Sequence, residues 1–258
     1  MARESRTQRV EGIVLKHADF GEADRMVTLF TLQEGKLRAV AKGARKPGSR
    51  KGGHLEPFTR VSLLLGKGRE IPIVEQAEAL ELNTALGSNL EALGYAAYVV
   101  ELVDKFNGDH DENRGVYRLT RDTLQRLAAG QDLRLTVRFF EVKLLEHMGF
   151  RPQLQHCAHC SKQIEPEDQY FSFELGGVLC PGCGRRHHAA RISLGSLKVL
   201  RHLQRSEFGQ VGGLALSAPV QHELERLMNG YVAYLAERSL NTPRFLERVR
   251  RSSKTKSD

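Results

Sequence analysis

The sequence has no apolar run near the roughly 20 residues that a helix needs to cross a bilayer. Its amino terminus, MARESR, is charged and leads into no apolar signal core, which is typical of a protein that is not exported. We therefore expect a soluble, cytoplasmic protein without membrane attachment.

Aromatic residues are also scarce, at 7% of the chain, and tryptophan is absent. Phe20, Phe30 and Phe58 are the only aromatic residues in the first 80 positions, and the core of that region needs some of them. Stacking on nucleobases is therefore limited there. Any nucleic-acid binding by this region has to depend on charge more than on stacking.

The chain lacks the Gly-x-x-x-x-Gly-Lys-Ser/Thr signature of a standard ATP-driven motor, because Gly66-Lys67-Gly68 is too short to match it. Two acidic groups, residues 109–112 and Glu22 with Asp24, lie in predicted turns. We interpret both as solvated loops, not as sites for catalytic divalent ions. The sequence thus predicts a protein that is not an enzyme. The alternative, a metal-dependent nuclease, predicts magnesium-dependent cleavage.

Only four cysteines are present, and they form two pairs, Cys157-x-x-Cys160 and Cys180-x-x-Cys183. Nineteen residues separate the pairs, a spacing typical of zinc sites. Four thiolates complete a tetrahedral zinc site and leave no open position, so we predict one structural Zn²⁺ ion. A redox-active pair is the alternative. Further imidazole ligands are available nearby, from His156, His159, His187 and His188.

Positive charge is concentrated in one segment of a chain whose net charge is +8 and whose pI is about 9.5. This favours a polyanionic partner. Between Glu34 and Glu56 seven cations occur without one acidic residue, and we predict that they contact nucleic acid: Lys36, Arg38, Lys42, Arg45, Lys46, Arg50 and Lys51. Arg185 and Arg186 extend this prediction to the cysteine region, with Arg191 nearby. A third basic cluster, residues 244–256, ends the chain.

Hydrophobic periodicity predicts an α+β fold. Five short strands are expected, at residues 13–15, 26–30, 37–40, 58–65 and 71–75, which suits an OB-type barrel, although an SH3-like barrel gives a similar pattern. The basic segment 42–53 falls between the third and fourth strands. Helices are expected at 86–106, 116–127, 135–148, 196–208 and 219–239, with a hairpin at 170–179. We thus expect an OB-fold domain at 1–80 and a helical domain at 81–258, interrupted at 152–188 by the zinc unit.

Several motifs together resemble the RecO family of recombination mediators. They are Gly12-Ile-Val-Leu15, Gly21-Glu-Ala-Asp-Arg25, Ala41-Lys-Gly-Ala-Arg-Lys46, Leu55-Glu-Pro-Phe58, Phe140-Glu-Val-Lys-Leu-Leu-Glu-His-Met-Gly-Phe-Arg-Pro152 and Pro243-Arg-Phe-Leu246. The resemblance covers residues 10–250. Because members of this family differ in their cysteines, the zinc prediction depends on the residues of this chain.

The resemblance implies an ATP-independent, nucleoid-associated factor of the RecF-type pathway. Such a factor binds single- and double-stranded DNA without sequence specificity, anneals complementary strands and works with single-strand-binding protein. With RecR it helps to load RecA onto gapped DNA. The alternative function is a zinc-ribbon scaffold that recruits protein partners without direct DNA binding, in which case the charge serves solubility.

Overall fold

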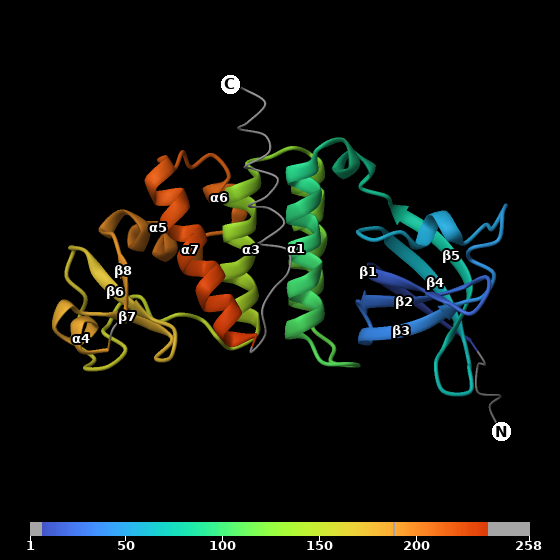
Figure 1. Cartoon of the computed structure of the whole chain (residues 1–258), viewed down its shortest axis with the longest axis horizontal. Helices are drawn as coiled ribbons and strands as arrows, with labels where there is room; N and C mark the ends of the chain where they lie inside the picture. Colours follow the sequence, from blue (N-terminus) through green and yellow to red (C-terminus); the bar gives the residue numbers. More distant parts are fainter. Residues whose placement is uncertain (1–6, 188, 237–258) are drawn as a thin grey trace. The chain divides into compact units, whose positions relative to one another are not determined.

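The computed structural model describes residues 7–187 and 189–236. These residues form two compact units, one extending to Ala129 and the other beginning at Gly130. The first unit consists of five strands followed by two α-helices, and the second unit contains further helices and a small three-stranded sheet (Figure 1). The expected boundary near residue 80 falls inside the first unit, at the end of its last strand, and stays a prediction about where the barrel domain ends.

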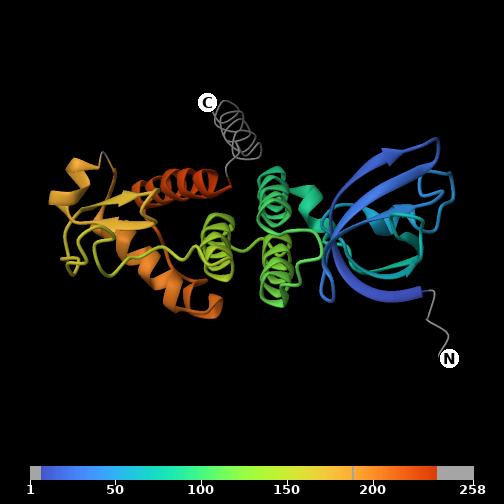
Figure 2. The same cartoon turned by 90° about the horizontal axis from the view of Figure 1, so that it is seen from below.

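Five strands of the first unit close into a barrel in the order β1-β2-β3-β5-β4. Strand β1 pairs antiparallel with β4 through its first half and with β2 through its second half, and β3 meets β5 in parallel. Figure 2 shows the strands of this unit from a second direction. This is the five-stranded Greek-key arrangement of the OB-fold, so the predicted fold class is confirmed and the SH3-like alternative is set aside. The strands are β1 (Thr7–Phe20), β2 (Asp24–Thr31), β3 (Gly35–Ala41), β4 (Arg60–Gly66) and β5 (Ile73–Glu81).

Aliphatic side chains fill the interior of the barrel. A register shift between Val14 and Lys16 lets β1 bend from one partner strand to the other. The core consists of Val10, Val14, Val27, Leu29, Leu37, Ala39, Ala41, Ala44, Leu55, Val61, Leu63, Leu65 and Val74. Two of these residues, Ala44 and Leu55, come from the connection between β3 and β4. That connection is therefore fastened to the core.

Two strands differ from the sequence prediction in their extent. Strand β1 is much longer than the three residues expected, because it pairs with two neighbours in succession. Strand β5 continues to Glu81, well past the predicted end at residue 75, because pairing with β4 compensates for its charged outer face. The alternating small residues Ala77 and Ala79 keep this strand compatible with the barrel.

Asparagine caps begin both helices of the first unit, α1 (Leu90–Phe106) and α2 (Arg114–Ala128). The Asn89 side chain accepts hydrogen bonds from the N–H groups of Glu91 and Ala92, so α1 begins at residue 90 and not at 86 as predicted. The preceding residues, Thr84–Ser88, form the 3₁₀ helix η2. Helix α2 ends before Gly130, whose φ of 69° supplies the left-handed conformation expected there.

Polar contacts fasten the helices to the barrel. The Tyr117 hydroxyl donates to Glu11 Oε1 at 2.9 Å, and the Arg60 guanidinium donates to the same oxygen at 3.0 Å. The Tyr117 ring also lies 6.4 Å from the ring of Phe30 between centroids. Near the same end of the helical pair, the Lys36 ammonium donates to the backbone oxygen of Asp104 at 2.6 Å.

The second unit consists of helices around a small sheet. Its elements are α3 (Leu133–His147), β6 (Gln169–Ser172), β7 (Gly177–Leu179), α4 (Pro181–Arg186), β8 (Ala190–Ile192), α5 (Leu194–Arg205), α6 (Phe208–Val211) and α7 (Ala218–Leu235). The sheet order β7-β6-β8 contains the predicted hairpin. Gly149 has a φ of 79° and follows α3 as expected.

Differences in the second unit concern short elements and caps. The sequence prediction missed α4 and β8, because six and three residues are too few to show a period. Ser193 caps α5, which ends at Arg205, three residues before the predicted end. Ser217 does precede α7, but its side chain makes no capping hydrogen bond. No helix among the described residues is long and apolar enough to span a membrane.

Replacement of Tyr117 by phenylalanine tests the link between α2 and the barrel. We expect the free energy of unfolding to fall by about 1.5–3 kcal/mol, because the hydrogen bond goes to a charged acceptor. Burial and Glu11 raise the pKa of Tyr117 above its usual value, so this residue stabilises the fold fully below pH 10 and less as the pH rises further. Urea denaturation at neutral and alkaline pH measures both effects. Tyr234→Phe, at an exposed side chain, serves as the control, and equal stability of the two variants would contradict the link.

Candidate functional site

The basic connection between β3 and β4, residues 42–59, begins against the turn that joins β1 to β2. The backbone N–H of Arg45 donates to Ala23 O at 2.9 Å, and the N–H of Gly43 donates to the Asp24 carboxylate at 2.7 Å. The Arg45 guanidinium lies 3.2 Å from the carboxylate of Asp19. The start of the connection is therefore held in place and is not a free arm.

Further along, the connection lies beside the start of β5. The Lys51 ammonium donates to Val74 O at 3.0 Å, and the short helix η1 (Gly52–Leu55) buries Leu55. Val74 follows the loop between β4 and β5 almost directly. OB-folds bind oligonucleotides with the loops after their first and fourth strands, so the basic connection runs between these two regions.

The seven predicted contact residues divide by their present partners. Lys36, Arg45 and Lys51 are engaged: Lys36 lies 3.4 Å from Asp104 Oδ1, and the other two make the contacts above. The remaining four are exposed and have no ion pair or side-chain hydrogen bond with any described residue: Arg38, Lys42, Lys46 and Arg50. These four offer their charge to a ligand without first breaking an internal contact.

Two cations that sequence reasoning did not select lie in the loop between β4 and β5. Lys67 and Arg69 are exposed, and no described residue pairs with them. Sequence reasoning considered Lys67 only within the rejected fragment Gly66-Lys67-Gly68 and did not consider Arg69. Once the five strands are assigned to an OB-fold, the position of this loop after the fourth strand is the signal that identifies them.

The aromatic side chains of the barrel offer little stacking surface, as expected. Phe30 is fully buried, Phe58 is partly buried, and Phe20 has 47% of its surface exposed. In the second unit Arg185 and Arg186 lie exposed on α4, and Arg191 lies on β8. The third predicted cluster, residues 244–256, and His188 lie outside the described residues.

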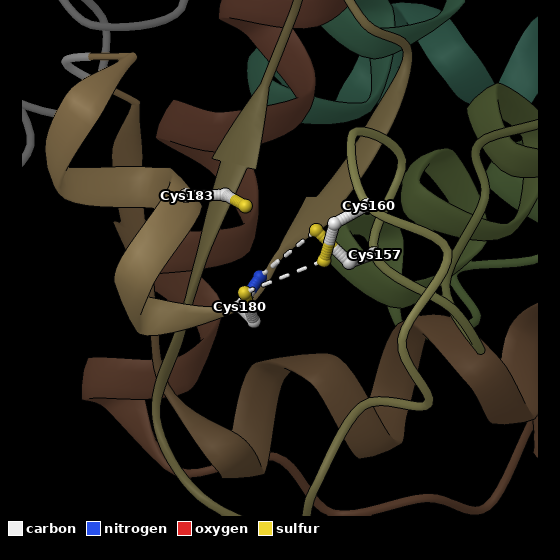
Figure 3. Close-up of side chains that lie close together, drawn as sticks. All are labelled: Cys157, Cys160, Cys180 and Cys183. Carbon is white, nitrogen blue, oxygen red and sulfur yellow. Dashed lines mark hydrogen bonds between the residues drawn. The ribbon is translucent and has the colours of Figure 1, made fainter.

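The four cysteine sulfur atoms converge between two backbone knuckles (Figure 3). All four Sγ atoms lie within 4.8 Å of one another, and those of Cys160 and Cys180 are 3.9 Å apart. Two thiolates on one tetrahedral zinc ion lie roughly 3.8 Å apart, given Zn–S bonds of about 2.3 Å. Ser161, at a φ of 60°, tightens the first knuckle, and its N–H donates to Cys157 O at 2.9 Å.

Backbone groups and neighbouring sulfurs perturb the thiols in opposite directions. Burial raises the pKa of Cys157, but N–H groups of Cys160, Cys180 and His159 outweigh it and lower that pKa to about 6. Desolvation and the other sulfurs raise the pKa of Cys183 to about 12. Four thiolates in so small a volume repel one another. A divalent cation removes that repulsion, so the cluster suits a bound metal ion.

The described histidines lie beside the cluster and are not needed to complete it. The His159 ring nitrogen Nδ1 lies 3.5 Å from Cys183 Sγ, and its ring is 4.6 Å from that of His187 between centroids. Within residues 7–187 and 189–236, the four cysteines are the one group of His, Cys, Asp or Glu side chains placed to share a metal ion.

The two acidic groups rejected as catalytic sites have structural contacts. Asp24 accepts from the backbone of the basic connection, as described above. In the connection between α1 and α2, Asp109 lies 3.7 Å from the Lys36 ammonium, and the N–H of His110 donates to Lys36 O at 2.8 Å. Both groups therefore hold neighbouring segments together.

Comparison with known proteins covers nearly the whole chain. The family model "Recombination protein O N terminal" matches residues 5–83, and "Recombination protein O C terminal" matches residues 87–244. The chain is 39% identical over 253 residues to the DNA repair protein RecO of Roseiflexus sp. (strain RS-1), a match that covers 98% of this chain and 89% of that protein. It is 40% identical over 247 residues to the protein of the same name from Desulforudis audaxviator, covering 95% of this chain and 98% of the relative.

Proposed function

This chain belongs to the RecO family of DNA repair proteins, and from that premise we propose that it binds DNA itself, by holding phosphates on the connection between β3 and β4. The observation that carries the proposal is the set of exposed cations without partners among the described residues: Lys42, Lys46 and Arg50 on the connection, with Arg38 on the preceding strand β3. Each cation that neutralises a phosphate releases condensed counterions, which supplies affinity without regard to sequence.

Fixation of the connection supports this proposal. Because Ala44 and Leu55 are buried in the barrel core, the intervening cations lie on a platform that loses little conformational entropy when a ligand binds. Lys67 and Arg69 extend the platform to the loop after β4. Lys36, Arg45 and Lys51 already contact the barrel or α1, and their positive charges add to those of the platform. Single- and double-stranded DNA both present the phosphates that this surface takes.

The finer roles follow from the family and not from the geometry. We propose that the protein anneals complementary strands, and that it works with single-strand-binding protein and with RecR to load RecA onto gapped DNA. We further propose that it acts in the cytoplasm at the nucleoid and without catalysis. Asp24 and Asp109, one from each acidic group that could be taken for a catalytic site, make structural contacts instead.

The ion at Cys157, Cys160, Cys180 and Cys183 is proposed to be one structural Zn²⁺. Thiolate ligands favour zinc over hard cations such as Mg²⁺, and four of them leave no position for a reacting water. The ion would fix the two knuckles and the sheet between them. Arg185 and Arg186, directly after the last cysteine, would thereby be held at the surface for a second contact with DNA.

The triple variant Lys42→Ala, Lys46→Ala, Arg50→Ala tests the DNA surface. We expect weaker binding to a random single-stranded oligonucleotide, and a slope of log affinity against log salt that is lower by up to about 2, since each lost phosphate contact removes about 0.7. Fluorescence anisotropy over a range of salt concentrations measures both quantities.

A matched control removes the same charge elsewhere. Arg118, Lys162 and Arg226 are exposed and unpaired among the described residues, so their triple alanine variant has the same net charge as the test variant. We expect it to bind nearly as the unchanged protein does. If both variants lost the same affinity, net charge alone would explain the effect and the proposed binding surface would be wrong. An unchanged protein that binds no oligonucleotide would favour the protein-recruiting scaffold.

Cys160→Ser tests the metal centre at an exposed position where packing is hardly altered. We expect one zinc ion per chain in the unchanged protein and none in the variant. The melting temperature should fall by about 10 °C, which corresponds to a loss of roughly 3 kcal/mol. Elemental analysis and calorimetry measure these quantities. A chelator should bring the unchanged protein to the variant's melting temperature and leave the variant unaffected, whereas equal stability without metal would rule out a structural ion.

A further inference from the structure

A pocket of about 310 Å³ in the second unit lies outside the barrel surface and beside the metal centre. The residues that line it include the aromatic residue Tyr170, the cations Arg185 and Arg191, and the acidic residues Asp168 and Glu223. A pocket that combines a ring, cations and acceptors is suited to a ligand with a flat body, a negative charge and hydrogen-bond donors.

The ring and the two cations are brought together by the sheet and by α4. Tyr170 on β6 is directly opposite Arg191 on β8, so their side chains leave the same face of the sheet as neighbours. Helix α4 packs so closely that a Cβ atom on Gly184 would lie 2.2 Å from Cγ of Tyr170. The next residue, Arg185, is thereby placed beside the ring. Neither arginine pairs with a described residue.

The acceptors differ in how far they are already satisfied. Glu223 accepts from the N–H of Ser193 at 3.1 Å and from both the Ser193 and Ser196 hydroxyls, so it is fully used in capping α5. Asp168 accepts from the N–H of Leu194 at 2.9 Å through one oxygen. Gln169 precedes Tyr170 on β6, so its side chain leaves the opposite face of the sheet and is buried there, with 1% of its surface exposed. The second carboxylate oxygen of Asp168 has no donor among the described residues, so it can accept a hydrogen bond from a ligand.

We infer that this pocket takes one unstacked nucleotide of a single DNA strand, which deepens the proposed function and rests on it. Arg185 and Arg191 hold the phosphate, the Tyr170 ring stacks on the base, and an amino group of the base donates to the free oxygen of Asp168. A free anion would leave the acceptors unmatched, and a cation would be repelled by the two arginines. A nucleotide supplies the charge, the flat ring and the donor in one ligand.

This arrangement discriminates between bases, unlike the phosphate contacts of the barrel. Cytosine and adenine carry an exocyclic amino group that donates hydrogen bonds, whereas thymine has a carbonyl oxygen in the equivalent position. The unchanged full-length protein should therefore bind oligo(dC) about two- to tenfold more tightly than oligo(dT) of the same length, the effect of roughly one added hydrogen bond.

The test compares both oligonucleotides with the variant Arg185→Ala, Arg191→Ala by fluorescence anisotropy. We expect the variant to lose the preference for oligo(dC) and to keep most of its affinity for oligo(dT), which the barrel supplies. The matched control is Lys162→Ala, Arg226→Ala, which removes the same charge from the second unit outside the pocket and should retain the preference. Zinc content and melting temperature verify that each variant is folded.

Photo-crosslinking of the unchanged protein to oligo(dC) that carries 5-iodocytosine gives a second measurement, which does not depend on how the variants fold. A crosslink to Tyr170, identified by mass spectrometry, is the expected result. Equal affinity for both oligonucleotides with crosslinks confined to the barrel would overturn the pocket and leave DNA binding by the barrel intact. No binding of either oligonucleotide would overturn both proposals.

Discussion

The pairing of β1 with two partners is the constraint on which the first unit depends. Because this strand bends between Val14 and Lys16, it can pair first with β4 and then with β2, which closes the sheet into a barrel. Closure places the turn after β1 and the start of β5 within reach of one connection, and that connection carries the unpaired cations. The charged surface is thus a consequence of how hydrogen bonds close the barrel.

In the second unit, contacts around the cysteine cluster hold the small sheet and its two knuckles together. Its sheet is small and its helix α4 is short, so little apolar surface holds the two knuckles in register. Convergent sulfur atoms, backbone donors to Cys157 and the close packing of Gly184 on Tyr170 act on the same few residues. A metal ion at this point would stabilise at once the sheet, the helix and the arginines that follow the last cysteine.

Much of the architecture could be predicted from local patterns, because alternation, asparagine caps and paired cysteines act over short distances. The strands around Val14, Leu29 and Leu37, and the convergence of the cysteines, are of this kind. What could not be predicted depends on partners distant in the chain. Lys36 appears available in the sequence, yet it is held by Asp104, which lies on another element. Helix α4 and strand β8 were missed because their few residues depend on tertiary packing.

The close passage of the α1–α2 connection over the β2–β3 turn restricts how the chain can vary. A Cβ atom on Gly35 would lie 2.0 Å from Asp111 O, so the backbones of the two turns are in direct contact and leave no room for a side chain at position 35. An insertion in that connection, or a larger residue at position 35, would force the two turns apart. By contrast, Gly48 at the tip of the basic connection has open space around it. Lengthening of the chain is therefore tolerable there, and homologues can differ in loop size at that tip while they keep the helical pair in place.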